Sequence, residues 1–428
     1  MTHPHVIVVG GGIAGLSTAY YLRQAGADVT VLETRRVGTG ASWGNTGWIT
    51  PAQAGPLPEP GLVGYGLRSL VDPRSALYFE PRQLVRMTPW LLQFAARCNE
   101  FDHARGRIAL GRLGVRCFEL LERMVADGVD VELHRAKLLV AGRSAEHAES
   151  FLARMRPLAT LGFAVPSSLL SGAEISVLEP ALTDVATVGF VIEQHWYVDP
   201  PALIAALRDR LRMLEVEIAE GTEMRDADMH GSRLRAVHTS TGIRRCDAAV
   251  LAPGAWLASL SHLFAERLPV QAGKGYSFEL RPRSMPRHPL LLLEPHVGCS
   301  PLGDRLRIAG TMEFSGVNTR LNWRRIESIL GGVSVMIEDA GPPDEDSVWS
   351  GLRPIAPDGL PIIDRDPRVQ NLFFAGAYSM LGMTLAAPAG ESLAGFVISG
   401  ERPAELEPFR CTRFRVPSRL RSRPRSAR

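Results

Sequence analysis

The sequence predicts a mixed α/β fold, because three segments far apart in the chain each have the pattern of a buried strand that ends in a glycine turn. These strands end at Gly10, Gly254 and Gly376. The pattern between them is mixed and does not alternate regularly between strands and helices. We therefore expect a mixed α/β chain that begins with a parallel strand.

The first of these segments is a complete strand–helix–strand unit. Four β-branched residues follow His5 and suit a central parallel strand. Residues 10–15 then match G-x-G-x-x-G, a helix pattern covers 14–25, and a second strand over 27–32 ends at Glu33. This order is typical of a Rossmann-like unit that binds a dinucleotide.

The physical role of each residue in that unit follows from its place. Gly10 permits the tight turn, Gly12 lets the backbone approach a pyrophosphate, and Gly15 lets the helix pack closely on the strand. Glu33 lies 18 residues after Gly15, where an acid accepts hydrogen bonds from ribose hydroxyls and disfavours a 2′-phosphate. The predicted ligand is FAD or NAD, and the predicted contacts here are Gly10, Gly12, Ile13, Ala14, Gly15, Glu33 and Thr34.

The rest of the chain favours FAD without NAD. No second G-x-G-x-x-G follows, and a proline- and glycine-rich stretch over 38–66 replaces the expected alternation. The strand after Asp247 ends in Ala252-Pro-Gly254, which resembles a turn of flavoproteins of the glutathione-reductase superfold. Helices are expected over 84–96, 108–127, 202–214 and 386–399, and strands near 129–140.

Composition excludes several classes of protein. The 428 residues are 45% hydrophobic and 22% charged, which suits a large folded core of two or three domains. Five scattered cysteines predict neither a disulfide framework nor a metal site. No apolar run is long enough to span a bilayer, and the N-terminal run leads directly into glycines, so we expect a cytoplasmic protein without a leader.

The charge of the chain is concentrated at its C-terminus. The net charge is +3, but residues 410–428 hold eight arginines and no acid, so removing them leaves the remainder at −5. A folded nucleic-acid-binding surface is therefore not expected. The tail is either a solvated terminus without a role or a basic segment that binds anionic lipid.

Three motifs in one order resemble the D-amino-acid oxidase and dehydrogenase family, which includes glycine oxidase and sarcosine oxidase. They are the N-terminal glycine fingerprint, Ala41-Ser-Trp-Gly-Asn-Thr-Gly47, and Gly351-Leu-Arg-Pro followed by Gly376-Ala-Tyr-Ser-Met-Leu-Gly-Met-Thr384. The resemblance extends from the first strand to Gly400 and is greatest to the bacterial D-amino-acid dehydrogenases.

The resemblance implies a Rossmann-like FAD domain of the glutathione-reductase superfold, interleaved with an antiparallel-sheet substrate domain. The implied segments are 1–60, 180–265 and 345–405 for FAD, 61–179 and 266–344 for substrate, and 406–428 for the basic tail. No cysteine lies in 347–352, so FAD is expected to be non-covalent. The implied further FAD contacts are Ser42, Asn45, Gly47, Gly254, Gly376, Met380, Leu381, Gly382, Met383 and Thr384.

The family's substrate contacts map onto three side chains. Arg353 corresponds to the arginine that grips the substrate carboxylate, which suits its planar fork. Tyr276 occupies a place where the substrate domain offers a hydroxyl, or else it is a core residue. Many relatives have histidine where this chain has Tyr378, a poor base at neutral pH. His195 and Tyr197 precede an Asp-Pro turn, and we expect them to be structural.

The implied reaction oxidises a small D-amino or imino acid, such as D-proline or D-hydroxyproline, by hydride transfer from Cα to flavin N5. A quinone or respiratory chain would then receive the electrons, and this would bring the protein to the inner membrane surface. Two alternatives stay open: an oxygen-using oxidase for glycine or sarcosine, and a flavin subunit of a hetero-oligomeric amine dehydrogenase. The oligomeric state is not predicted.

Overall fold

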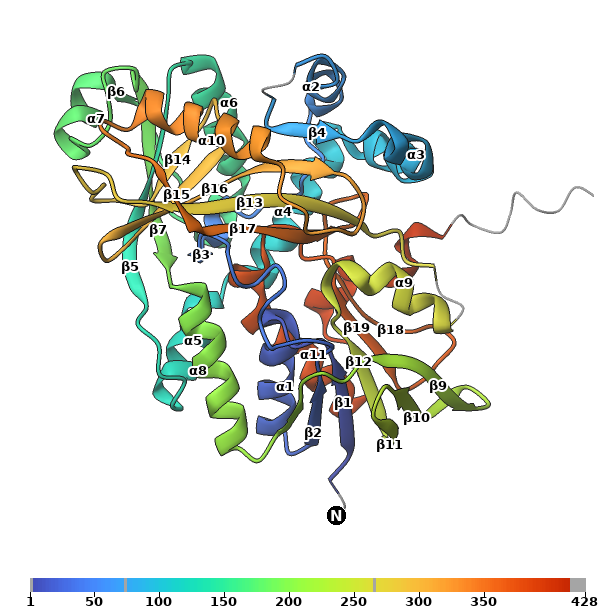
Figure 1. The fold of residues 1–428 in the computed structure, drawn as a ribbon. Helices are drawn as coiled ribbons and strands as arrows, with labels where there is room; N and C mark the ends of the chain where they lie inside the picture. Colours follow the sequence, from blue (N-terminus) through green and yellow to red (C-terminus); the bar gives the residue numbers. More distant parts are fainter. Residues whose placement is uncertain (1–2, 73–74, 265–266, 416–428) are drawn as a thin grey trace, which may run out of the picture.

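The computed structural model describes residues 3–72, 75–264 and 267–415, which form two sheets with helices around them (Figure 1). The smaller sheet has six strands in the order β18-β19-β12-β1-β2-β8. All pairs are parallel except β18 with β19. Their bounds are β1 His5–Val9, β2 Asp28–Leu32, β8 Glu217–Ala219, β12 Ala248–Leu251, β18 Ile362–Arg365 and β19 Leu372–Gly376.

Helices cover one face of this parallel sheet, and a small antiparallel sheet covers the other. The helices are α1 Ile13–Gln24, α4 Glu100–Gly114, α5 Cys117–Ala126, α8 Pro200–Met213 and α11 Gly382–Ser399. The covering strands are β9 Met224–His230, β10 Arg233–Thr239 and β11 Gly242–Arg245. A Cβ at Gly390 would lie 3.0 Å from the backbone of Ser17, so α1 and α11 cross at backbone contact.

The larger sheet has ten strands and lies above the parallel sheet in the view of Figure 1. Its main path is β17-β13-β16-β15-β14-β5-β7-β3, largely antiparallel, with β4 on β16 and β6 on β7. The bounds are β3 Trp48–Ile49, β4 Leu77–Phe79, β5 His134–Gly142, β6 Leu170–Ser171, β7 Val188–Tyr197, β13 Gln271–Leu280, β14 Leu290–Leu292, β15 Val297–Leu302, β16 Arg305–Phe314 and β17 Pro343–Ile355.

Helices at the edges complete the larger layer. They are α2 Leu62–Ser69, α3 Pro81–Arg97, α6 Ala145–Met155, α7 Gly172–Leu178 and α10 Trp323–Met336, whereas α9 Leu257–Ser261 packs beside the parallel sheet. Apolar residues of α10 and α7 pack on one set of strands, and those of α6 pack on another. Among the described residues, no helix combines the length and apolarity that crossing a bilayer requires.

The strand pairing moves two predicted segment boundaries. β7 pairs with β5 in the larger sheet, so the second segment of the parallel-sheet unit begins with α8 and not at residue 180. β17 pairs with β13, so the third segment begins after Ile355 and not at 345. The single helix predicted over 108–127 is two helices, α4 and α5, which are separated at Val115 and Arg116.

The predicted tail begins as packed structure. Arg413 donates two hydrogen bonds to the Asp358 carboxylate, at 2.6 and 3.0 Å. The buried Cys411 donates its backbone N–H to Asp364, and Arg410 pairs with Glu407. The predicted solvated or lipid-binding tail therefore does not begin at 410, and its remainder, 416–428, lies outside the described residues.

Candidate active site

One large cavity, of about 1850 Å³, lies where the carboxyl ends of the parallel strands meet the larger sheet. Gly10 and Gly376 line it from the parallel side, and Gly275 and Arg353 line it from the larger sheet. Every residue that we predicted to bind cofactor or substrate lines this cavity, except Gly15 and Gly47.

The glycine turn after β1 is shaped by close backbone contacts. Gly10 has φ +113°, and a Cβ there would lie 2.3 Å from the carbonyl oxygen of Ala252. A Cβ at Gly15 would lie 1.9 Å from the carbonyl oxygen of Gly10. Gly254, with φ +60°, lines the cavity just beyond Ala252. Gly15 thus serves helix–strand packing, and the cavity wall is left to Gly10, Gly12, Ile13 and Ala14.

Two side chains that we predicted to contact the cofactor, Glu33 and Ser42, also hold this turn in place. Glu33 accepts the Gly11 N–H at 2.8 Å and the Arg35 N–H at 2.9 Å, one on each carboxylate oxygen. Ser42 accepts the Ile13 N–H at 3.0 Å through its hydroxyl. Both side chains line the cavity, and Thr34 is exposed at the same wall. Glu33 therefore braces the turn while it faces the space where a ribose would lie.

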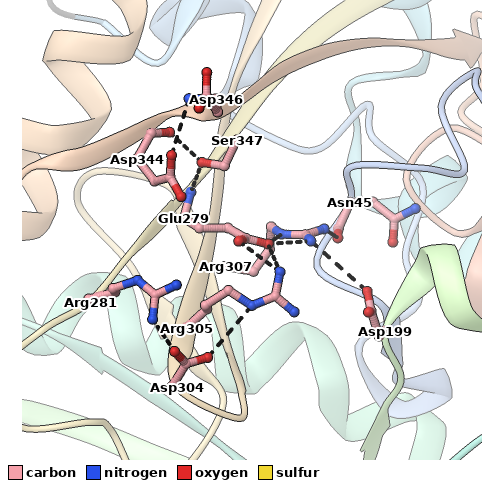
Figure 2. Close-up of polar contacts among 10 residues, drawn as sticks. All are labelled: Asn45, Asp199, Glu279, Arg281, Asp304, Arg305, Arg307, Asp344, Asp346 and Ser347. Carbon is pink, nitrogen blue, oxygen red and sulfur yellow. Dashed lines mark hydrogen bonds and ion pairs between the residues drawn. The ribbon is translucent and has the colours of Figure 1, made fainter.

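The loop from Asn45 to Gly47 joins the two sheets. Asn45 accepts the Gly47 N–H at 2.8 Å, which closes a turn, and a Cβ at Gly47 would lie 1.8 Å from the Val198 carbonyl oxygen. Figure 2 shows Arg307, which is held by Glu279 at 2.6 Å, donating to the Asn45 carbonyl. Gly47 is thus required for packing against Val198, in contrast to the predicted cofactor contact.

The second glycine turn connects β19 to α11 and carries strained backbone. Ala377 and Ser379 have φ of +58° and +51°, a region that residues other than glycine seldom adopt. Such strain is common at functional sites. The turn delivers the first residues of α11 to the cavity, where the helix N-terminus favours negative charge. The predicted residues placed here are Gly376, Met380, Leu381, Gly382, Met383 and Thr384.

Tyr378 lies between the two strained residues and faces the cavity. The side chain is 4% exposed, and its hydroxyl has no hydrogen-bond partner among the described residues. Burial raises the pKa of Tyr378, so its hydroxyl stays protonated at neutral pH. It can donate or accept one hydrogen bond with a ligand in the cavity, but it cannot act as a strong base.

Arg353 is the most informative side chain of the site. Its Nη1 donates to the Thr311 carbonyl at 2.7 Å, and no acid pairs with it among the described residues. A Cβ at Gly275 would lie 2.3 Å from the guanidinium, which therefore lies flat on that glycine. Burial lowers the pKa of Arg353 to about 10, so it stays charged at neutral pH. A partly buried cation without an anion loses hydration that an anionic ligand would replace.

Tyr276, for which the sequence left a substrate contact or a core role open, lies at the edge of the cavity. Its hydroxyl donates to Glu313 at 2.7 Å, and Glu313 forms a buried ion pair with Lys274 at 2.8 Å. The ring belongs to the core of the larger sheet. Neighbouring side chains of a strand point to opposite faces, and Gly275 is the residue that faces Arg353. This arrangement favours the core role over a substrate contact.

Sequence reasoning missed Gly275 and Thr311. Gly275 makes room for the guanidinium, and Thr311, with φ +65°, presents the carbonyl that orients it. A signal was available for the first, because glycines at 273 and 275 inside a strand mark a close approach of another group. Thr311 carries no such signal. His195 is fully buried outside the cavity wall, in line with the structural role predicted for it.

The wall facing the parallel sheet fits FAD. The cradle at Gly10 leaves no room for a side chain, α1 and α11 both begin at the cavity, and Glu33 stands at the end of β2. A dinucleotide needs this combination of close backbone approach, helix N-termini and a ribose acceptor. The residues that would hold it are those of the two glycine turns together with Glu33 and Ser42.

Comparison with known proteins agrees with this geometry. The sequence model of the DAO family, described as FAD dependent oxidoreductase, matches residues 5–395. A D-amino acid dehydrogenase of Methylobacterium radiotolerans is 32% identical and aligns over 93% of this chain and 96% of its own. A second D-amino acid dehydrogenase, of Granulibacter bethesdensis, is 28% identical over the same share of both chains.

Solved structures show the same fold. A glycine oxidase of Geobacillus kaustophilus superposes with a TM-score of 0.74 at 23% identity, over 96% of this chain and all of its own. An L-proline dehydrogenase of P. horikoshii gives 0.72 at 17%, over 96% and 98%. The chain therefore belongs to the DAO family of FAD-dependent oxidoreductases and is an enzyme whose cofactor is FAD.

Proposed function

We propose that this enzyme oxidises small D-amino or imino acids at Cα, with D-proline and D-hydroxyproline within its range. The relatives that carry the name D-amino acid dehydrogenase support the substrate class. The observation that carries the proposal is Arg353, a partly buried cation on the cavity wall that forms no ion pair with an acid among the described residues.

Arg353 would bind the substrate carboxylate through its planar fork. Its Nη1 is already oriented by the Thr311 carbonyl, and Gly275 supports the flat face, so little freedom is lost on binding. A bidentate contact fixes direction as well as position. The carboxylate held in this way presents Cα–H to one side of the cavity, toward the wall that suits FAD.

Tyr378 would complete the grip on the substrate. Its unpartnered hydroxyl can donate to the substrate carboxylate or accept from the amine. The enclosing walls keep water from the reacting carbon. FAD, when bound, supplies the two-electron acceptor for the oxidation. The resulting imine would hydrolyse to a 2-oxo acid outside the protein's control.

Mixing the holoenzyme anaerobically with a panel of amino acids tests the proposal. We expect D-alanine and D-proline to bleach the flavin, and their L-enantiomers to do so at least about tenfold more slowly. Flavin bleaching by sarcosine or glycine, and not by the D-amino acids, would indicate the alternative enzyme, an oxidase for glycine or sarcosine. Peroxide release in air, compared with reduction of a dye, separates an oxidase from a dehydrogenase. Bleaching by L-amino acids alone would contradict the proposal.

The electron acceptor that we propose is a membrane quinone, which would require contact with the membrane surface. Residues 416–428 carry five arginines and no acid and could supply that contact. Deleting 416–428 should abolish low-salt binding to anionic vesicles while flavin content and dye-linked activity persist. The shortened chain keeps Arg413 on Asp358, so it remains folded at this end. Unchanged sedimentation with the vesicles would exclude the tail.

A further inference from the structure

Another arginine, the buried Arg107 of α4, lines the same cavity. Arg107 is only 5% exposed, and its Nε and Nη1 have no hydrogen-bond partner among the described residues. Nη2 lies 3.2 Å from Nε2 of His103, one helical turn earlier. Two nitrogens of this guanidinium, Nε and Nη1, therefore have no acceptor in the part of the chain that the structure describes.

His103 does not neutralise this charge. Burial lowers the pKa of His103 to about 4, so the ring is neutral at physiological pH. Its Nδ1 lies 3.1 Å from the Pro58 carbonyl and donates to it, which leaves Nε2 to accept from Arg107. His103 therefore orients the guanidinium and adds no negative charge.

The nearest acid is shared with another arginine. The charge of Glu59 attracts Arg107, but Glu59 forms its ion pair with Arg154, at 3.4 Å. Two arginines and one carboxylate therefore meet at this part of the cavity, and burial lowers the pKa of Arg107 to about 10 while leaving it charged. An anion from outside the protein would balance the local charge.

Arg107 is presented to the cavity in the same manner as Arg353. A Cβ at Gly55 would lie 2.6 Å from Nη2 of Arg107, just as Gly275 lies under Arg353. The segment that follows β17 also contacts α4, because Leu360 packs 3.3 Å from the position of a Cβ at Gly106. Two guanidinium groups thus face one cavity, each laid on a glycine and neither in an ion pair with an acid of residues 3–72, 75–264 or 267–415.

We propose that Arg107 binds a second carboxylate at the far end of the substrate, so that the preferred substrates are D-amino acids with an acidic side chain. This rests on the proposed function, in which Arg353 holds the α-carboxylate. The Arg107 guanidinium, oriented by His103, offers its charge and the unpartnered N–H groups of Nη1 to that second carboxylate.

Matched substrate pairs test the proposal without any variant. D-aspartate is compared with D-asparagine and D-glutamate with D-glutamine, by anaerobic flavin reduction in the holoenzyme. We expect the acid of at least one pair to be favoured in kcat/KM by about tenfold or more. The favoured chain length reports the separation of the two arginines. Amides that react as well as the acids in both pairs would overturn the proposal.

Two variants on α4 locate the effect. Arg107→Gln should remove the preference for acid over amide, and Arg107→Lys, which keeps the charge and loses the fork, should retain part of it. The exposed Arg105 on the same helix is the control, and Arg105→Gln should leave the preference unchanged. A preference that persists in Arg107→Gln would overturn the proposal.

Binding of unreactive acids gives a readout that does not depend on turnover. Calorimetry with the holoenzyme should show glutarate binding about tenfold or more tightly than butyrate, and Arg107→Gln should remove that difference. Equal affinity in the wild type would overturn the inference even if D-alanine is oxidised. If no D-amino acid reduces the flavin, the proposed function fails, and the glutarate comparison still decides whether Arg107 binds a second carboxylate.

Discussion

The two walls of the cavity are built in different ways. The wall facing the parallel sheet consists mainly of backbone: glycine turns at Gly10 and Gly376 and the first turns of α1 and α11. The opposite wall consists of side chains, such as Arg353 from β17 and Arg107 from α4, each supported by a glycine of another segment. A backbone wall suits a cofactor common to a family, whereas a side-chain wall can change with the substrate.

The largest expected loss of stability follows from a substitution behind the side-chain wall. Lys274→Met removes the partner of Glu313 from a pair in which both side chains are 3% exposed. Leaving that carboxylate buried without its cation should cost about 3–5 kcal/mol of unfolding free energy. Denaturant unfolding measures this loss.

The exposed pair Lys137–Glu193 provides the control, because both side chains are more than half exposed at a similar distance of 2.9 Å. Lys137→Met should cost less than about 1 kcal/mol. Equal losses for the two lysine variants would show that the pair behind the side-chain wall contributes no more than a surface contact.

The next effect tests the backbone wall. Gly15→Ala places a Cβ 1.9 Å from the Gly10 carbonyl oxygen, so the turn must shift, at about 3 kcal/mol. We expect flavin to be lost on purification while the far-UV circular dichroism persists. Gly395→Ala on α11, with nothing within 4 Å, should retain flavin. A flavin-replete Gly15→Ala enzyme would show that this close contact is not needed.

A smaller, pH-dependent change in stability is expected from His195 of β7. His195 packs edge-on against Trp48 at 5.5 Å, and burial lowers its pKa to about 3. In the unfolded chain His195 binds a proton near pH 6.5, whereas in the folded chain it stays neutral. The contribution of His195 to the free energy of unfolding is therefore fully present above pH 6.5 and decreases below it. At pH 5 the loss due to His195 is about 2 kcal/mol.

Unfolding of His195→Leu at pH 7 and pH 5 measures that share. The variant should lose less stability between the two pH values than the wild type does. His262, which is exposed, provides the matched control, and His262→Leu should follow the wild-type profile. Equal pH dependence in wild type and His195→Leu would show that His195 is not held neutral.

The contrast between the walls also explains what the sequence could predict. The backbone wall is local in the chain: a strand, three glycines and a helix within residues 5–25 specify it. Arg353 was identified only through the family resemblance, because its support comes from Gly275 and Thr311 on two other strands. The sequence left two roles open for Tyr276, substrate contact or core, because only the strand pairing shows that its hydroxyl bonds to Glu313.

Two other features depended on pairing that the chain does not reveal locally. β7 and β17 pair with β5 and β13 within the larger sheet, and nothing in their own residues marks that pairing, so the boundaries at 180 and 345 were misplaced. Arg107 lay just before the predicted helix and was overlooked. Its signal was the spacing of His103, Arg107 and Leu110, which puts two polar residues on the buried face of α4.

The most direct test of the central claim measures whether Arg353 reads a substrate carboxylate. Anaerobic flavin reduction is compared for D-alanine and D-alaninamide, in the wild type and in Arg353→Lys. We expect the wild type to favour the free acid by about 10- to 100-fold. Arg353→Lys should lose most of this preference with FAD still bound. Equal rates for acid and amide in the wild type, or an unchanged preference in Arg353→Lys, would contradict the central claim.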